Sequence, residues 1–346
     1  MIKKLLATSA LVSTLALTNV SFAQTTITGS LDLTLRNTSR DLSGGAASET
    51  TMGRETQLNI ANKGKLNNGL DYAAGFSLEF DGQNDNTTIN SDSNENVYIN
   101  LIMGGTTLTV GVDHIQNSQQ DLLNATGDIQ DEVGQTTVAG VLLDTTGFRS
   151  PKEDIGVGIY HNFGNGIVAS GLYTPNNTNT GTGNQTGTLV STTGTNSAYE
   201  LGIRGSNVAN SGVSFDLWKN EVEKPTPATL RNVEGLGYSL NYNTGPYGIG
   251  ASRIKSERGD AATELKSTLA HVTYAVNKNL SASLVYAKTE DTAAASTADE
   301  KIKSLMVGYN FGPVGLLVTA SKIDDIGGRS ANEDAEALGI SLNTKF

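Results

Sequence analysis

Four acidic side chains fall within a dozen residues of one long polar stretch, namely Asp121, Asp128, Asp131 and Glu132. Carboxylates gathered in this way attract cations and repel anions. The alternative is a solvated acidic surface loop without a binding role. A second set of loop acids offers oxygen ligands of the kind that Ca²⁺ prefers, and these are Asp81, Asp85, Asp92 and Glu95. No segment has the spacing of an EF-hand, so the sequence predicts no metal site and leaves loop-bound Ca²⁺ as a weak alternative.

Catalytic chemistry has little support in the sequence. The histidines His114, His161 and His271 do not fall in a His-Glu-x-x-His metal motif, and there is no phosphate-binding Gly-Lys-Ser/Thr loop. Because His271 alternates with the apolar face of Val272 and Tyr274, we expect it on a polar, wet face, which needs no catalytic explanation. The sequence therefore predicts a protein that is not an enzyme and has no cofactor.

The two ends of the chain indicate an exported protein that crosses a membrane with strands. Lys3 and Lys4 precede a mainly apolar run to Val20, and Ser21-Phe22-Ala23 supplies a small–x–small cleavage site. We predict a signal peptide over 1–23 and one domain over 24–346; a membrane-anchor helix is the alternative. At the other end, apolar residues alternate with polar or small ones up to the final Phe346. Such a period of two is typical of a strand between two different solvents.

The composition agrees with that interpretation. Hydrophobic residues make up 37% of the chain, which is low for a large buried core, and there are no cysteines, which weakly favours an exported chain. Removal of the signal takes away two of the 24 basic residues and none of the 35 acidic ones, which leaves a net charge of −13. This balance argues against nucleic-acid binding and favours the repulsion of anions.

Turn signals recur along the whole chain and set the number of strands. The seven compact ones are 62–69, 104–105, 164–166, 206–212, 244–246, 277–279 and 312–313. The eight longer polar stretches between them are 37–53, 82–94, 114–152, 176–197, 220–232, 257–263, 289–300 and 325–334. Fifteen connections predict sixteen strands with both termini on the short-turn side. The facing of the strands near 167–174 and 247–255 is ambiguous.

Aromatic residues cluster beside the short turns, as they do in the interfacial girdle of a membrane barrel. They are Tyr72, Phe163, Tyr242, Tyr247, Tyr274, Phe311 and Phe346. We therefore predict an all-β fold, a sixteen-stranded antiparallel transmembrane β-barrel with short periplasmic turns. A barrel of that size leaves an aqueous channel. The longest loop, 114–152, which carries the acidic cluster, is the candidate to fold inward and narrow it.

The mature chain resembles the general porins of Gram-negative outer membranes. The resemblance rests on the opening strand 26–32, the long third loop and the closing strand 339–346. The third loop lacks the Pro-Glu-Phe-type motif of enterobacterial members, so the chain looks closer to the alphaproteobacterial branch. The resemblance implies an outer-membrane location, a homotrimer, contact with membrane lipid and lipopolysaccharide, and passive diffusion of small hydrophilic solutes. It also implies that Ile340, Leu342 and Phe346 form the signal read by the barrel assembly machinery.

In that family, acids on the third loop face basic residues on the opposite wall, and the field between them orients dipolar solutes. The resemblance therefore makes the following residues the candidate basic partners: Arg36, Arg54, Arg149 and Arg204. Arg204 is best placed for this role, since it lies on the non-apolar face of its predicted strand. Arg36 lies on the same face of its predicted strand as Asp32. Arg54 lies on the same face of its predicted strand as the apolar Leu58 and Ile60. In an alternative interpretation it therefore lies at the rim of the barrel. With the acidic balance, we predict a diffusion channel with a modest cation preference. The alternatives are a channel specific for a sugar or cationic solute, with Trp218, Tyr98 and Tyr160 as aromatic contacts, and a barrel that acts as an adhesin.

Overall fold

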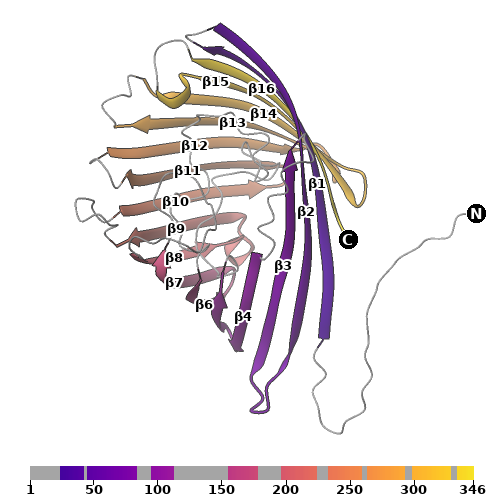
Figure 1. Cartoon of the computed structure of the whole chain (residues 1–346), viewed down its shortest axis with the longest axis vertical. Helices are drawn as coiled ribbons and strands as arrows, with labels where there is room; N and C mark the ends of the chain where they lie inside the picture. The colour runs from indigo at the N-terminus through magenta and orange to yellow at the C-terminus, as the bar shows by residue number, and fades with distance from the viewer. Residues whose placement is uncertain are drawn as a thin grey trace, which may run out of the picture.

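A computed structural model shows that the chain forms a closed antiparallel barrel of sixteen strands, each paired with its neighbours in sequence (Figure 1). The structure describes residues 24–42, 45–83, 95–112, 155–177, 196–223, 233–258, 263–292, 298–328 and 333–346. Within those residues, no helix is long and apolar enough to cross a membrane.

The first eight strands are β1 (Gln24–Leu42), β2 (Gly45–Lys65), β3 (Asp71–Gln83), β4 (Glu95–Met103), β5 (Thr106–Gly111), β6 (Gly156–Gly164), β7 (Ile167–Asn177) and β8 (Asn196–Gly205). The others are β9 (Val213–Val222), β10 (Val233–Thr244), β11 (Tyr247–Arg258), β12 (Thr263–Ala275), β13 (Leu280–Asp291), β14 (Glu300–Asn310), β15 (Val314–Asp324) and β16 (Asp334–Lys345). Two short 3₁₀ turns lie between strands, η2 (Val208–Asn210) and η3 (Ile326–Gly328).

The predicted number of strands is confirmed, and the seven short turns fall at the predicted places. The first predicted loop is wrong in length. Instead of a loop over 37–53, β1 continues to Leu42 and β2 begins at Gly45, and the two strands pair up to those residues. This part of the hairpin is polar on both faces, so it lacks the apolar–polar alternation that marks a strand whose faces meet lipid and water.

Large apolar side chains point outward from the wall along every strand whose facing was predicted. Leu201 on β8, Leu240 on β10 and Leu284 on β13 are exposed, while both sequence neighbours of Leu284 are buried on the inner side. The outer wall of a membrane barrel carries such an apolar band where it meets lipid. The exposed leucines therefore mark the lipid-facing side.

The two strands of ambiguous facing carry apolar residues on both sides of the wall. On β11, Ile249 is 58% exposed and faces outward, whereas Ile254 is 1% exposed and faces inward. On β7, Tyr173 is exposed and the preceding Leu172 is buried. A period-two pattern loses contrast when both faces hold apolar residues, which explains why the sequence left these strands undecided.

The barrel closes where β1 pairs with β16. The Gly29 N–H donates to the Phe346 carbonyl at 2.8 Å, and the Phe346 N–H donates to the Gly29 carbonyl at 2.9 Å. A Cβ at Gly29 would lie against the Phe346 ring, so the absence of a side chain there gives the ring its place over the seam. Leu342 and Ile340 pair with Leu33 and Leu35 farther along the same seam. The final residues thus complete the wall, while their role as an assembly signal stays a prediction.

Aromatic side chains lie at the short-turn ends of the strands, as predicted. Tyr247 stacks on Tyr274 with 5.2 Å between ring centroids, and Tyr309 meets Phe311 edge-on at 4.5 Å. Phe163, Tyr242 and Phe346 are exposed beside their turns. This distribution matches one aromatic girdle of a membrane barrel.

Part of the inner wall is apolar and buried, which the expectation of a uniformly wet interior did not include. A cluster spans the inner faces of β9 and β11–β16 together with η3, and its members are Trp218, Ile254, Leu269, Val285, Ala287, Ile302, Met306, Ile323, Ile326 and Ala335. Trp218 lies across Gly235 and Gly237 of the next strand, where any Cβ would meet its indole ring. The glycines on β10 therefore create the space that lets this large ring pack flat against the wall.

The connection between β15 and β16 folds onto the inner face and completes this cluster. The Gly327 N–H donates to Oε2 of the fully buried Glu300 at 3.0 Å, and the Ala298 N–H donates to the Gly328 carbonyl at 3.0 Å. Gly327 and Gly328 both have positive φ, at 70° and 71°, which glycine adopts without the steric cost of a Cβ. These bonds hold Ile326 against the cluster.

We expect Trp218→Ala to destabilise the barrel by about 3–5 kcal/mol, because truncating a buried aromatic side chain leaves a cavity. Trp218 is 1% exposed, whereas its sequence neighbour Leu217 is 49% exposed and faces outward. Leu217→Ala is therefore the matched control, with a much smaller expected loss. Urea unfolding in micelles, followed by circular dichroism, measures both. Equal losses for the two variants would show that the inner face is not packed.

Candidate pore lining

The inner faces of β1–β3 form a polar surface whose charged and amide side chains are half-buried or exposed, whereas its hydroxyl side chains Thr34, Thr38, Thr51 and Ser77 are buried. The Gln57 amide donates to Glu79 at 2.7 Å, the Asn59 amide donates to Gln57 at 3.1 Å, and the Ser77 hydroxyl donates to Asn59 at 2.5 Å. The bonds to Glu79 and from Ser77 join β2 to β3, and the bond from Asn59 to Gln57 lies within β2; together they orient these side chains. We call this surface, the inner faces of β1, β2 and β3, the polar sector.

Charged side chains follow one another along the polar sector. On β1, Asp32, Arg36 and Arg40 share the inner face, and Ser341 of β16 donates to Asp32 at 2.6 Å. In the register of β1 and β2, Asp32 lies opposite Glu55, and Thr38 lies opposite Glu49. Over the inner faces of β1–β3 as a whole the described acids exceed the basic residues by one, with Asp32, Glu49, Glu55, Asp71 and Glu79 against Arg36, Arg40, Lys63 and Lys65. A solute that passes along it meets a net negative surface.

The inner faces of β8–β13 differ, because their polar side chains are buried. Glu200, Asp216, Asn220, Ser252 and Ser267 are all nearly inaccessible. Asp216 accepts a hydrogen bond from the Ser239 hydroxyl of β10. The polar groups of this part of the wall are thus engaged in packing, while partly accessible inward polar side chains lie on the polar sector and, elsewhere on the described wall, at positions such as Asn100, Tyr160 and Arg204.

The structure separates the four arginines that the sequence offered as pore-wall candidates. Arg36 lies on the inner face of β1, within the polar sector. Arg204 also faces inward, but it is the second-last residue of β8, near the short turn, where it lies opposite Asp216 in register. Arg54 lies on the outer face with the exposed Met52, which agrees with the alternative of a rim position. Arg149 lies outside the described residues.

The remaining predicted positions are placed as follows. The structure does not describe the predicted signal peptide over 1–23. It also does not describe the loop acids Asp121, Asp128, Asp131 and Glu132, or the side chains of Asp81, Asp85, Asp92 and Glu95. His271 is buried on the inner face, as its parity indicated, and His161 contacts Thr106 at 2.8 Å. In the part of the chain with described side chains, no three His, Cys, Asp or Glu residues come together as metal ligands would.

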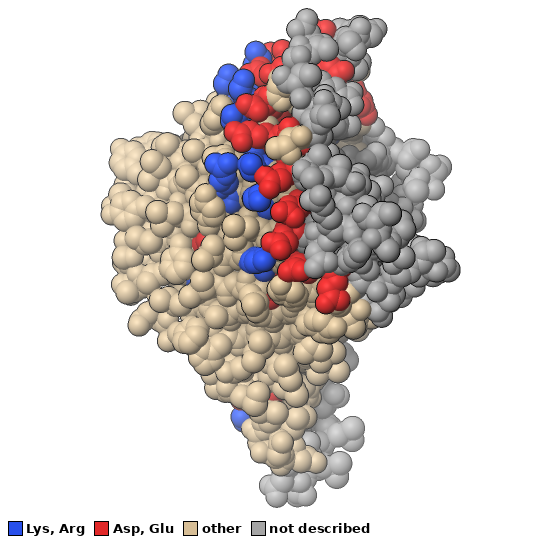
Figure 2. Space-filling model, turned by 90° about the vertical axis from the view of Figure 1, so that its left-hand side faces the viewer, with Lys and Arg blue, Asp and Glu red and all other residues tan. Residues whose placement is uncertain are grey.

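A band of ion pairs on the outer wall is the feature that the sequence interpretation missed. It runs across β9–β15 at their long-loop ends, where Figure 2 shows blue and red side chains between a largely uncharged surface and the grey residues. Glu264 joins Lys255 at 2.6 Å and Lys266 at 2.8 Å, and Lys288 joins Asp299 at 2.8 Å and Glu290 at 2.9 Å. We call these residues the outer ion belt.

A sequence signal for the outer ion belt existed. Its charged residues fall at every second position, on the same face of the strand as the lipid-facing residues. On β13, for example, Lys288 and Glu290 follow Tyr286 at steps of two. Each exposed pair contributes little to stability, about 0–1 kcal/mol. The level at which the outward residues change from apolar to charged is the informative observation, because it marks where hydrocarbon gives way to headgroups.

Comparison with known proteins agrees with the barrel. A family model described as Gram-negative porin matches residues 7–342. This chain belongs to the Gram-negative porin family. The porin is therefore an outer-membrane protein whose barrel forms a channel for small solutes, and channels of this family are typically not enzymes. The closer assignment to an alphaproteobacterial branch stays a prediction.

Solved structures similar to this porin share its fold at low sequence identity. An anion-selective porin from Comamonas acidovorans is 14% identical with a TM-score of 0.63, covering 94% of this chain and 100% of that one. OprB of Pseudomonas putida is 9% identical with a TM-score of 0.63, covering 93% and 94%. A mutant of the Rh. blastica porin is 12% identical with a TM-score of 0.58, covering 93% and 100%. The comparison with curated proteins found no match.

The difference between the two inner surfaces can be measured by cysteine labelling, since the natural chain has no cysteine. We expect Asn59→Cys, in the polar sector, to react at least about tenfold faster with a charged thiosulfonate reagent than Ser267→Cys, because reaction requires a water-accessible thiolate. Ser267 is buried on the inner face of β12. Leu240→Cys, which faces lipid, is a second slow control. Similar rates at Asn59 and Ser267 would contradict the division of the inner wall.

Proposed function

We propose that this porin is a passive diffusion channel with a weak preference for cations. The observation that carries the proposal is the polar sector, in which Asp32, Glu49, Glu55 and Glu79 accompany Arg36 and Arg40 on the accessible inner wall. Fixed charges beside a narrow aqueous path select ions of opposite sign. The excess of carboxylates raises the local concentration of cations relative to anions, in agreement with the acidic composition of the chain.

The pairing of Asp32 with Glu55 supports the same sign of selectivity. These two carboxylates lie opposite each other on neighbouring strands, and like charges in that position repel. A cation between them relieves the repulsion. The Ser341 hydroxyl, which donates to Asp32 at 2.6 Å, helps to hold one member of the pair in the lining.

The third loop supplies the constriction in this proposal. Asp121, Asp128, Asp131 and Glu132 then stand at the narrowest point, with Arg36 and Arg204 as inward-facing basic residues of the described wall and Arg149 as a further candidate. Arg54 is not included, because it faces outward. We also propose that the porin assembles as a homotrimer after removal of residues 1–23, with membrane lipid and lipopolysaccharide around it.

A track specific for a sugar or a cationic solute has less support. Trp218 is buried, so its ring offers no surface to a passing solute, and Tyr98 and Tyr160 are half-buried on separate strands. Broad passive diffusion is therefore the function that the described lining favours.

Neutralising the polar sector should weaken cation preference. A unit charge about 8 Å from the path of an ion in water contributes roughly 0.5 kcal/mol before screening. We expect the triple variant Glu49→Gln, Glu55→Gln and Glu79→Gln to lower the K⁺/Cl⁻ permeability ratio by roughly twofold per carboxylate, as measured from the reversal potential across a planar bilayer under a KCl gradient.

The matched control neutralises three carboxylates of the outer wall, Glu234→Gln, Glu264→Gln and Glu336→Gln, and should leave the reversal potential unchanged. An anion-selective wild-type channel would contradict the predicted preference. Equal shifts in both triple variants would show that net charge, and not the lining, sets the selectivity.

The loop acids call for a separate variant, with Asp121→Asn, Asp128→Asn, Asp131→Asn and Glu132→Gln combined. If these residues stand at the constriction, the reversal potential should shift more than in the wall variant, because a charge acts most strongly where the path is narrowest. An unchanged reversal potential would assign the cluster to a solvated surface loop.

A further inference from the structure

The short-turn end of the barrel is basic, although the chain as a whole has a net charge of −11. All seven short turns lie within the described residues. The charged side chains in these turns and at the strand ends beside them are Lys63, Lys65, Asp71, Lys278 and Lys345. Slightly farther from the turns, Arg204 lies opposite Asp216 in register, and this pair adds no net charge. The excess of acids therefore belongs to the rest of the molecule.

Three of these lysines face the lumen. Lys63 and Lys65 continue the inward positions of β2, and Lys345 lies opposite the inward-facing Ser30 of β1. Lys65 pairs with Asp71 at 2.5 Å, and the two side chains are 55% and 51% exposed. Lys63 and Lys345 are also exposed, and neither makes an ion pair with a described residue. The mouth of the channel at this end is thus lined by ammonium groups that are open to water.

The two chain ends do not change this balance in the mature protein. The carboxylate of Phe346 lies at the short-turn end, and so does Gln24, which lies opposite Lys63 in the register of β1 and β2. Removal of residues 1–23, as proposed above, leaves an amino group at Gln24 that offsets this carboxylate. The net positive charge of the short-turn end then comes from Lys63, Lys278 and Lys345.

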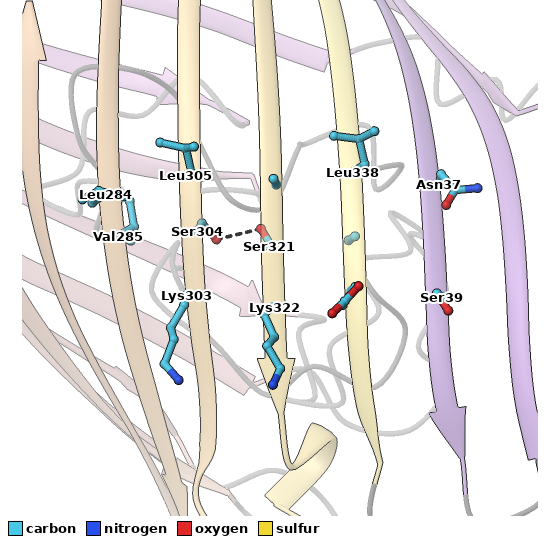
Figure 3. A pocket seen from close by; sticks show the side chains of 13 residues that line it. Asn37, Ser39, Leu284, Val285, Lys303, Ser304, Leu305, Ser321, Lys322 and Leu338 are labelled. Atoms are coloured by element: carbon cyan, nitrogen blue, oxygen red, sulfur yellow. Dashed lines mark hydrogen bonds between the residues drawn. The ribbon is translucent and has the colours of Figure 1, made fainter.

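Lysines at the long-loop end are, in contrast, balanced by acids. Figure 3 shows Lys303 and Lys322 of β14 and β15 extending toward that end. Their ammonium groups lie 3.4 and 3.2 Å from the carboxylate of Asp324, and Glu336 lies opposite Lys322 in register. Two lysines and two acids cancel there. The excess of positive charge is therefore a feature of the short-turn end.

Along the lumen, the lysines of the short-turn mouth are followed by acids. Glu55 lies eight positions farther in than Lys63 on β2, opposite Asp32 of β1, and Glu79 faces inward on β3. At about 3.3 Å per residue, Lys63 and Glu55 are about 26 Å apart along the strand. That is more than the distance of about 10 Å over which 0.1 M salt screens a charge. Lys345 marks the boundary, because it lies one inward row nearer the turns than Asp32.

Two arginines lie farther in than these acids but do not remove the asymmetry. Arg36 and Arg40 follow Asp32 on the inner face of β1, and Glu49 lies opposite Thr38 between them. The chain is strongly acidic although its short-turn end is positive, so its other parts carry a larger negative charge than the total shows. The contrast between the two ends of the channel is therefore a property of the whole chain.

We propose that this porin rectifies ion current and conducts better when the long-loop side is at the positive potential. The property rests on the proposed function, since a barrel that does not conduct has no current to rectify. Cations are concentrated in the acidic part of the channel and anions at the basic mouth. A positive long-loop side drives both kinds of ion toward the boundary between the two regions, where they accumulate and raise the conductance. The opposite potential depletes that boundary of both.

The test is a current–voltage measurement across a planar bilayer with the same KCl solution on both sides. In about 0.1 M KCl, we expect the current at about 100 mV, positive on the long-loop side, to exceed that at the reverse potential by about 1.5-fold. In about 1 M KCl the screening length falls to about 3 Å, so the ratio should approach one.

The orientation of the inserted channel is assigned with a single cysteine. The natural chain has no cysteine, and Asn67 lies exposed in the turn after β2. Biotin attached to Asn67→Cys binds streptavidin only from the chamber that the short turns face. A change in current after streptavidin is added to one chamber therefore identifies that side.

Variants of the mouth show whether its lysines cause the asymmetry. We expect the double variant Lys63→Gln and Lys345→Gln to bring the ratio in about 0.1 M KCl down to about 1.1, and Lys63→Glu with Lys345→Glu to reverse the preferred polarity. The matched control, Lys303→Gln with Lys322→Gln, removes the same number of lysines from the outer wall and should keep the wild-type ratio. Heat-dependent gel migration identifies the variants that form a folded barrel.

Equal currents at the two polarities in about 0.1 M KCl would overturn the proposal, as would a larger current with the short-turn side positive. A ratio that is unchanged in the Lys63 and Lys345 variants, or that persists in about 1 M KCl, would assign the asymmetry to the shape of the channel. An anion-selective channel that rectifies in the expected direction would support this proposal and contradict the proposed cation preference. A cation-selective channel that does not rectify would do the reverse.

Discussion

The pairing of β1 with β16 is the constraint on which the rest of the molecule depends. A backbone N–H or C=O group left unpaired in hydrocarbon costs several kcal/mol, so a sheet can cross a membrane only when it has no open edge. Here the edge is removed by a seam that runs from Asp41 opposite Asp334 to the bonds between Gly29 and Phe346. Once the sheet is closed, every strand has one face toward lipid and one toward the interior. The alternation of side chains then determines the chemistry of both surfaces, and any function must be built from the inward half of the residues.

The interior uses that half in two different ways. On β1–β3 the charged and amide-bearing inward residues are half-buried or exposed, and Gln57, Asn59 and Glu79 are linked by hydrogen bonds to one another and to the buried Ser77. On β9 and β11–β16 many of them are apolar and buried, with Trp218 seated on the glycines of β10 and Ile326 held in place through Gly327 and Glu300. A barrel of sixteen strands is wide enough for a water channel. The packed cluster and the polar sector meet at the seam, where Ala335 of β16 lies opposite Arg40 of β1.

The sequence was sufficient for the fold because lipid-facing residues give a signal at every strand. Leucines such as Leu240 and Leu284 are apolar where their neighbours are not, and glycine-containing turns separate the strands. The signal failed where that contrast was missing. The polar end of the first hairpin has two wet faces, and β11 places Ile249 in lipid and Ile254 in the inner cluster. The facing of Arg54 and Arg36 followed from parity alone. The accessibility of each inward surface could not be predicted from parity. It depends on a packed cluster whose members, such as Trp218 and Ala335, lie far apart in the chain.

The outward residues of a single strand record the whole cross-section of the membrane. Along β14, Lys301 and Lys303 lie at the long-loop end, Leu305 and Val307 follow, and Tyr309 precedes Phe311 at the short turn. At about 3.3 Å per residue, the distance from Lys301 to Phe311 is about 33 Å along the strand. A tilt of about 40° reduces this to about 25 Å of height, which is the usual thickness of the apolar band of an outer-membrane barrel. The lysines therefore stand at one boundary of the hydrocarbon and the aromatic residues at the other.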